Sequence, residues 1–368
     1  MSSPVPGTIY AERLARVRAE LAARGLDGFV VPISDEHMSE YVGDYAQRMA
    51  WLTGFGGSAG TAAVLPEKAA VFVDGRYTVQ VRDQVDGSLF DYVGVPQSSV
   101  AEWLGANISA GQKVGYDPWL HGIDWARGLE KALAAKGAML VAVDTNPIDA
   151  AWDDQPAPSA AVVTVHDAAL AGQGAVEKRE IIADWLKAKG LDTTVMTALD
   201  SVAWTFNIRG TDVSHTPVGL AFALLHADAT ADLFIAPEKV TDAVRAHLGN
   251  SVRIHDRGAF EAALADLAGK KVAVDPDRAV AAIFTALEGA GAQIARWRDP
   301  AVLPKAIKNA TELDGTRAAH VRDGVAVSRF LKWMEEVAPQ GNLDELGAAA
   351  KLREFRDESG VLKDLSFD

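Results

Sequence analysis

A short motif that occurs twice is the feature that most restricts the fold of this chain. Gly-Leu-Asp is found at residues 25–27 and again at 190–192, each time between a helix-like segment and a strand-like segment. A looser match relates Trp51–Phe55 to Trp204–Gly210. Because a motif that recurs in the same structural context indicates duplication of a whole unit, the sequence predicts two α/β domains of one kind.

The first domain is predicted to be a mixed sheet flanked by helices, and we place it at residues 1–157. Proline and aspartate are frequent over residues 144–160, which is typical of a connector between domains. Apolar spacing predicts helices over residues 9–24, 99–104 and 125–136. Buried strands are predicted over residues 28–32, 61–65, 69–73, 113–116 and 138–143.

The second domain, placed at residues 158–302, repeats this order. Helices are predicted over residues 176–189 and 260–267. Strands are predicted over residues 193–197, 219–225, 231–235 and 271–274.

The remaining residues, 303–368, are predicted to form two helices. Asn309 with Glu312, and Asn342 with Glu345, have the spacing of helix-start capping boxes. Both helices carry apolar stripes, and no strand-like segment follows on which these stripes could pack. The region is therefore interpreted as the opening of an incomplete domain.

Composition excludes several kinds of site. The chain has no cysteine, which excludes disulfides, thiol nucleophiles and cysteine-ligated zinc. The net charge of -14 makes nucleic acid and anionic membranes poor partners. No two histidines lie within five residues of each other, and no secretory signal or long apolar run is visible. We therefore expect a cytoplasmic protein with no locally encoded metal site.

One glycine-rich segment imitates two catalytic motifs. Gly56–Gly60 matches the Gly-x-Ser-x-Gly pattern of a serine nucleophile, and Gly54-x-Gly56 imitates the start of a dinucleotide fingerprint. Both motifs need a helix directly after the glycines. A strand-like segment, Thr61–Leu65, follows instead. The segment is therefore interpreted as a turn.

Arg76 lies in a predicted tight turn, Asp74–Tyr77, at the end of a strand. The simple interpretation is that Asp-Gly forms the turn, Arg76 is solvated and Tyr77 packs. The functional alternative is that the rigid turn presents the Arg76 guanidinium to a peptide carboxylate or carbonyl.

The segment Trp204–Val218 is the densest mixture of polar and aromatic residues, and both of its interpretations stay open. It could be a loop whose Trp204 packs into the core while Arg209 pairs with Asp212. It could equally be a recognition wall in which Trp204 is a platform for an apolar or prolyl ring. His215 belongs to the same segment.

Taken together, the motifs resemble those of three-domain Xaa-Pro aminopeptidases, the aminopeptidase P group of creatinase-like metallopeptidases. The resemblance spans essentially the whole chain, in order. It rests on segments 39–41, 54–61, 74–77, 198–210, 215–218, 305–309, 319–320 and 365–367.

The resemblance implies two creatinase N-terminal-like domains followed by the start of a pita-bread domain. It also implies removal of the N-terminal residue from Xaa-Pro peptides. Two divalent metal ions, commonly manganese, would be held by two Asp, one His and two Glu of the pita-bread domain. Arg76, Trp204, Arg209 and His215 lie in matching motifs and are the candidate residues of the substrate cleft. The same resemblance is compatible with a homodimer.

The chain departs from the family pattern because the segments that supply the five metal ligands come after Leu365–Phe367. We therefore assign no catalytic residue, no metal ligand and no metal to this chain, and we expect it to be inactive alone. One alternative is a non-catalytic binding or assembly module built from creatinase-like domains. A second, weaker alternative is a creatinase or dipeptidase relative, although these usually have one N-terminal domain.

Overall fold

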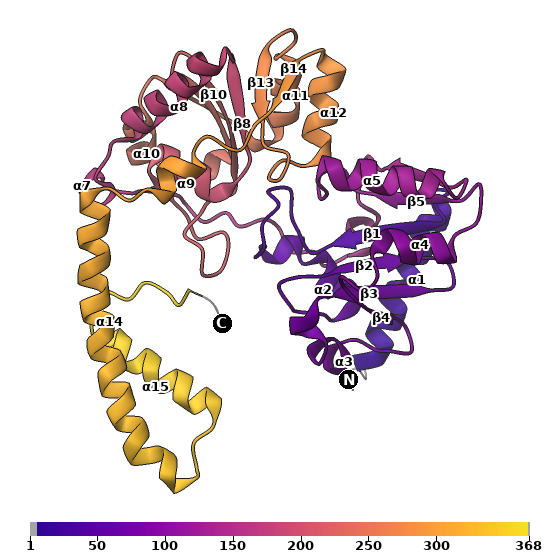
Figure 1. Cartoon of the computed structure of the whole chain (residues 1–368), viewed down its shortest axis with the longest axis horizontal. Helices are drawn as coiled ribbons and strands as arrows, with labels where there is room; N and C mark the ends of the chain where they lie inside the picture. The colour runs from indigo at the N-terminus through magenta and orange to yellow at the C-terminus, as the bar shows by residue number, and fades with distance from the viewer. Residues whose placement is uncertain (1–5, 367–368) are drawn as a thin grey trace.

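The structure is a computed structural model that describes residues 6–366. Residues 1–5, and Phe367 of the Leu365–Phe367 motif, lie outside the described part. Figure 1 shows two α/β domains side by side and a helical arm that extends from the second domain. Each domain contains one six-stranded mixed sheet, as the duplicated motif predicts.

The sheet of domain I has the strand order β4-β3-β2-β1-β5-β6. Strands β1 to β3 are antiparallel neighbours, and the β3–β4, β1–β5 and β5–β6 pairs are parallel. The strands are β1 (Gly28–Pro32), β2 (Thr61–Val64), β3 (Ala69–Val73), β4 (Asp91–Gly94), β5 (Lys113–Tyr116) and β6 (Met139–Ala142).

Side chains that alternate along these strands form two apolar cores, one on each face of the sheet. One face packs against α1 (Pro6–Ala23), α2 (Arg48–Thr53) and α6 (Pro147–Ala151). The other face packs against α4 (Val100–Asn107) and α5 (Ile123–Ala134). The short α3 (Gln80–Gln84) follows the turn η2 (Gly75–Tyr77).

The sheet of domain II repeats this topology with the order β12-β11-β10-β8-β13-β14. Its parallel and antiparallel pairs correspond one to one with those of domain I. The strands are β8 (Thr193–Met196), β10 (Ala221–His226), β11 (Ala231–Ile235), β12 (Val252–His255), β13 (Lys271–Val274) and β14 (Gln293–Arg296). A small extra ladder joins β7 (Thr164–Val165) to β9 (Ile208–Arg209).

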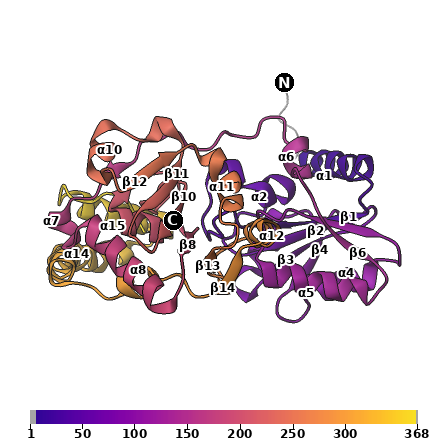
Figure 2. The same ribbon diagram turned by 90° about the horizontal axis from the view of Figure 1, so that it is seen from above.

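Helices cover both faces of the second sheet, as Figure 2 shows from above. The helices of domain II are α7 (Ala168–Ala171), α8 (Ala175–Lys189), α9 (Leu199–Phe206), α10 (Asp242–Leu248), α11 (Phe260–Ala265) and α12 (Ala281–Ala290). The sequence interpretation of Trp204 as part of a loop is wrong, because Trp204 lies on α9. Two short 3-10 turns, η3 (Pro237–Lys239) and η4 (Arg257–Ala259), complete the domain.

The repeated Gly-Leu-Asp forms the same joint in both domains. Gly25 and Gly190 end α1 and α8 in the left-handed region, with φ of 67° and 64°. Each aspartate then exchanges two hydrogen bonds with a neighbouring strand. Asp27 N–H donates to Lys113 O at 2.7 Å and its Oδ2 accepts Lys113 N–H at 2.8 Å. Asp192 does the same with Lys271, at 2.9 Å and 2.8 Å, so the motif fixes helix end and strand register together.

The two domains are joined by α5 of domain I, which packs on α12 of domain II. Ile123 and Ala126 of α5 belong to the apolar core of the second sheet. Backbone bonds from Ala281 N–H to His121 O, 2.7 Å, and from Ala282 N–H to Pro118 O, 2.9 Å, fix the junction.

The arm consists of α13 (Val302–Ala306), α14 (Ala310–Val337), η5 (Ala338–Gln340) and α15 (Glu345–Asp357). Asn309 caps α14 in a capping box, as the sequence predicts. The predicted cap of the last helix is wrong by two residues, because Asp344, and not Asn342, accepts the Gly347 N–H. Only Ala326 of α14 is buried among the described side chains. No helix in the described part is long and apolar enough to cross a membrane.

Candidate functional site

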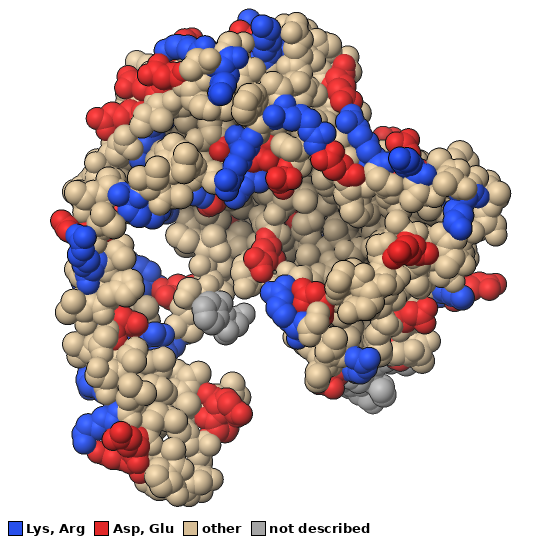
Figure 3. Space-filling view, in the orientation of Figure 1, with Lys and Arg blue, Asp and Glu red and all other residues tan. Residues whose placement is uncertain are grey.

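One loop of domain I and three segments of domain II line a cavity of about 370 Å³ that we call the cleft. Figure 3 shows that the molecule is hollowed on this face, between the two domains. The domain I wall is the loop from His37 to Tyr41. The domain II wall is formed by Ala198–Asp200, Val213, Thr216, Val218 and Arg278. Beneath both walls lies an apolar cluster that contains Val42, Tyr45 and Ala46 of domain I and Leu199, Ala203, Val213, Val218 and Leu220 of domain II.

The domain I wall is held by Asp35, whose Oδ1 accepts the N–H groups of His37 and Ser39, both at 3.0 Å. The buried His37 ring stacks on Phe222 of domain II at 4.3 Å. Its Nδ1 lies 2.8 Å from Thr197 O, also in domain II. Burial lowers the pKa of His37. The ring is therefore a neutral hydrogen-bond donor to Thr197 and a structural bridge between the domains.

Glu36 forms a second bridge, because its carboxylate pairs with Arg257 of domain II. The Tyr45 hydroxyl donates to the same oxygen at 3.0 Å. Burial works to raise the pKa of Glu36, but the charge of the Arg257 guanidinium and its hydrogen bond hold that pKa well below its usual range. Glu36 is therefore ionised, and it fixes the base of the loop rather than offering a titrating group to a ligand.

The domain II wall, the loop that contains His215, is anchored by a buried ion pair between Asp212 and Lys239. Asp212 Oδ2 also accepts the Leu220 N–H at 2.6 Å. His215 has a left-handed backbone with φ of 59°. Its Nδ1 lies 3.0 Å from Leu365 O, so the described end of the chain packs against the rim of the cleft at this residue.

Arg76 stands at the surface of domain I, with its guanidinium over the ring of Tyr77, and a chain of hydrogen bonds connects Tyr77 to the cleft. Its side chain is 61% exposed and pairs with Asp74, which also caps the turn. Tyr77 OH lies 2.8 Å from Ser58 Oγ, and Ser58 Oγ donates to Glu40 at 3.2 Å. Glu40 lines the cleft. Three motifs that are far apart in sequence therefore meet beside one wall.

Trp204 and Arg209, the other two predicted cleft residues in domain II, lie outside the cleft. Trp204 is 6% exposed, within the core of domain II, and the Lys178 Nζ lies 4.5 Å from its ring centre. Arg209 Nη1 donates to Ala203 O at 3.0 Å and to Ile208 O at 2.9 Å, so it closes the end of α9. The expected Arg209–Asp212 pair is wrong, because Lys239 takes Asp212. The burial of the Trp204 ring corrects its interpretation as an open platform, since the ring packs in the core of domain II and Lys178 covers it.

The sequence interpretation did not single out Glu40, and it considered Ser58 only as a nucleophile, which it rejected, although both residues lie in the motifs on which the resemblance rests. Ser58 directly precedes β2 and no helix follows it, which agrees with a turn and not a nucleophile elbow. Its hydroxyl is used to join Tyr77 to Glu40. The signal available in the sequence was the grouping of these motifs, not the chemistry of any one of them.

Metal binding is not supported by the described residues themselves. Within residues 6–366, no group of three or more His, Asp or Glu side chains is placed to hold a metal ion. A dinuclear centre needs such a set of oxygen and nitrogen ligands. The residues of the cleft therefore do not fit a metal pair.

Comparison with known protein families gives two matches along the chain. Models described as "Creatinase/Prolidase N-terminal domain" match residues 13–150 and residues 154–312. Each match contains one of the two six-stranded sheets.

Curated relatives and a solved structure agree with these matches. "Probable Xaa-Pro aminopeptidase P" of Aspergillus clavatus is 37% identical over 97% of this chain and 56% of its own length. The Aspergillus niger protein of the same name is 36% identical over 97% of this chain and 60% of its own length. The X-prolyl aminopeptidase of Caenorhabditis elegans, described as a cytosolic enzyme with a di-nuclear active site, superimposes with a TM-score of 0.90. It is 29% identical over 98% of this chain and 61% of its own.

Proposed function

The chain belongs to the creatinase/prolidase family, on the branch of Xaa-Pro aminopeptidase P, and from this membership we propose that it takes part in removing the N-terminal residue from Xaa-Pro peptides. The observation that carries the proposal is the similarity to the aminopeptidases over almost the whole chain, in sequence and in fold. The chain spans a little over half the length of these relatives, so the activity is proposed for the complete protein.

The proposed role of the described residues is to shape the entrance through which a peptide reaches the reacting centre. The cleft lies where the two domains meet, and its walls are held by buried ion pairs and by an apolar cluster. Rigid walls of this kind favour short, extended peptides over folded proteins. Proline-containing peptides are therefore the proposed substrates, in a cytoplasmic setting like that of the cytosolic relative.

Two divalent metal ions, proposed to be manganese, would supply the water-derived nucleophile and stabilise charge in the complete enzyme. We place their ligands outside the residues described here. The direct check is calorimetric titration of this chain with Mn²⁺, which should give no stoichiometric binding. Tight uptake of two ions per chain would contradict this part of the proposal without affecting the role of the cleft.

Arg76 provides the test of the cleft. Its guanidinium is exposed beside the cleft, and the Asp74 pair and the Tyr77 ring hold it in place. We expect Arg76→Ala in the complete protein to raise the KM for a Xaa-Pro tripeptide about tenfold, the size of one lost charged hydrogen bond.

Arg16→Ala is the matched control, because Arg16 is an exposed, ion-paired arginine of α1. It should leave KM unchanged. Circular dichroism should first show that both proteins are folded. Equal KM values for the Arg76 variant and the parent would then mean that Arg76 is only a solvated residue of the turn.

A further inference from the structure

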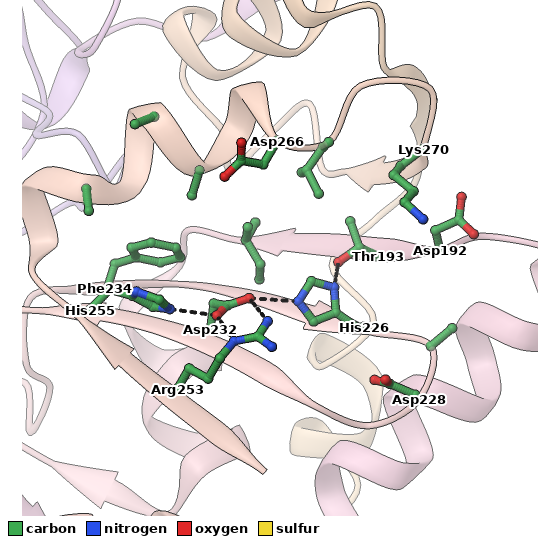
Figure 4. A pocket seen from close by; sticks show the side chains of 16 residues that line it. Asp192, Thr193, His226, Asp228, Asp232, Phe234, Arg253, His255, Asp266 and Lys270 are labelled. Atoms are coloured by element: carbon green, nitrogen blue, oxygen red, sulfur yellow. Dashed lines mark hydrogen bonds and ion pairs between the residues drawn. The ribbon is translucent and has the colours of Figure 1, made fainter. Parts of the chain in front are cut away.

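A second cavity lies in domain II, apart from the cleft. It has a volume of about 780 Å³, within the range of small-molecule sites. Figure 4 shows it as a slot between α11 and the surface of strands β10 to β12. Neither the cleft nor the proposed peptidase activity uses any residue of this slot.

The floor of the slot is built around one buried carboxylate, Asp232, which is 7% exposed. Its Oδ1 accepts hydrogen bonds from Arg253 Nε and His255 Nε2, both at 2.6 Å. Its Oδ2 accepts from Arg253 Nη2 at 2.6 Å and from His226 Nε2 at 2.8 Å. Burial works to raise the pKa of Asp232, but these bonds outweigh it and hold that pKa well below its usual range. The carboxylate is therefore ionised and saturated.

The fold does not require this polar cluster, and the duplication provides the internal control. Strand register relates each position of the second sheet to one of the first. Three of the four equivalents in domain I are apolar: Leu65 for His226, Ala70 for Asp232 and Val93 for His255, while Arg253 corresponds to the exposed Asp91. In domain I the three apolar residues pack with Trp103 and Leu104 of α4 in a closed core. Domain II thus holds a buried carboxylate where domain I has an apolar core, and the desolvation cost of that charge is offset only by its four hydrogen bonds.

The cluster is not arranged for a metal ion. The two imidazoles contact different oxygens of Asp232, so they do not converge on one point. The described residues contain no group of three metal-ligating side chains placed to hold an ion. Any ligand of the slot would therefore use its other hydrogen-bonding groups.

The slot offers unpaired groups of both positive and negative charge. Among the described residues, Arg253 Nη1 and Lys270 Nζ have no hydrogen-bond or ion-pair partner, and neither has the Asp266 carboxylate. Asp228 keeps one oxygen that accepts no described hydrogen bond. Arg253 comes from the strand side and Asp266 from the end of α11, on opposite sides of the slot (Figure 4). Between them the lining is small and apolar: Leu224, Phe234, Ala259, Ala262, Ala263 and Leu267.

We propose that this slot of domain II binds a small zwitterion, a free amino acid or a short peptide. Its carboxylate would pair with the free edge of Arg253, its ammonium would pair with Asp266 on the opposite side, and its side chains would lie against the alanines of α11. Asp232 and the two histidines hold Arg253 in place, so the guanidinium is preorganised for a planar carboxylate. The proposal stands independently of the peptidase activity.

Calorimetric titration of the chain with alanyl-alanine tests the proposal. This dipeptide has no proline, so its binding reports on the slot and not on a substrate. The free dipeptide should bind, and N-acetylation or C-terminal amidation should each weaken binding at least about tenfold, because each removes one of the two charges. Equal binding of the capped forms, or no binding of the free form up to about 10 mM, overturns the proposal.

Two variants locate the ligand. Asp266→Asn should weaken binding of the free dipeptide at least about tenfold and abolish discrimination against the N-acetyl form, since it removes the ammonium partner. Arg253→Gln should abolish discrimination against the amide. Asp242→Asn, an exposed aspartate of α10 outside the slot, is the matched control and should bind like the parent. If Arg253→Gln unfolds the domain, the test rests on Asp266→Asn, because Asp266 is exposed. Unchanged affinity of that variant for the free dipeptide overturns the proposal.

Discussion

At the scale of single residues, buried ion pairs between loops stabilise the fold. The Lys239–Asp212 pair is almost inaccessible, with side chains 2% and 0% exposed. Lys239 also donates to Ser159 O at 3.1 Å, so one ammonium connects the domain connector to the His215 loop. A buried pair of this kind is sensitive to loss of one partner, because the other charge is then left without compensation.

We therefore expect Lys239→Met to lower the free energy of unfolding by about 3–5 kcal/mol, as measured by urea denaturation. The double variant Lys239→Met/Asp212→Asn removes the orphaned charge and keeps an acceptor for the Leu220 N–H, so it should recover more than half of this loss. A cost below about 1 kcal/mol for the single variant would show that water reaches Asp212.

His121 makes stability depend on pH. It is buried against Trp125, with ring centres 4.0 Å apart, and burial lowers its pKa to about 4. The unfolded chain binds this proton at a higher pH than the folded chain does. Stability is therefore lost as the pH falls from about 6.5 toward 4, by up to about 3 kcal/mol from this group.

His121→Phe removes the titrating ring and keeps the stacking partner of Trp125. It should flatten the decline in unfolding free energy between about pH 6.5 and 4, leaving the contribution of His37, whose pKa burial also lowers. Below about pH 4.5 the loss due to Glu36 should persist in both proteins, because its folded pKa is depressed to about 2. An unchanged slope in the His121 variant would mean that the ring is not desolvated.

At the scale of elements, the two Gly-Leu-Asp joints should behave as equivalent structures. An added Cβ at Gly25 or Gly190 meets nothing within 4 Å, so Gly→Ala there tests the left-handed backbone alone. Each variant should lose about 1–2 kcal/mol of unfolding free energy. Gly128→Ala is the control: Gly128 lies inside α5 with open space around it, and the variant should gain about 1 kcal/mol. Unequal losses at the two joints would show that the repeats have diverged in strain.

The sequence predicted the central strands of both sheets because these strands are buried along their length, as β1 and β11 are. It did not predict β4, β12 or β14. These lie at sheet edges and mix exposed with half-buried residues, so they lack an apolar run. The Trp204 segment was ambiguous because aromatic spacing alone does not separate a short buried helix from a packed loop.

The site was predictable only in part, for a related reason. The Arg76 turn is local, and the sequence identified it. The link from Tyr77 through Ser58 to Glu40 depends on how β2, η2 and the loop after β1 come together, which local spacing does not determine. The bridges from His37 and Glu36 to domain II depend on domain packing and left no local pattern.

At the scale of the whole molecule, the two domains share an interface that resembles a core more than a hinge. Trp119, in the loop before α5, packs on Phe222 and Phe260 of domain II, with ring centres 6.3 Å and 6.4 Å apart. His37 stacks on the other side of the same phenylalanine cluster. Aromatic contacts of this kind contribute beyond the area they bury.

We therefore expect the two domains to unfold together, in one calorimetric transition, although most two-domain chains unfold in steps. Trp119→Ala removes the central aromatic contact from the domain I side and leaves both sheets intact. It should split the transition in two, because each domain keeps its own core but loses the coupling between them. Trp297→Ala is the matched control, since Trp297 is 42% exposed and contacts Trp185 of its own domain.

A parent protein that already unfolds in two steps would show that the interface does not couple the domains. The cleft, whose walls come one from each domain, would then lack the rigidity on which its proposed selectivity for short peptides depends.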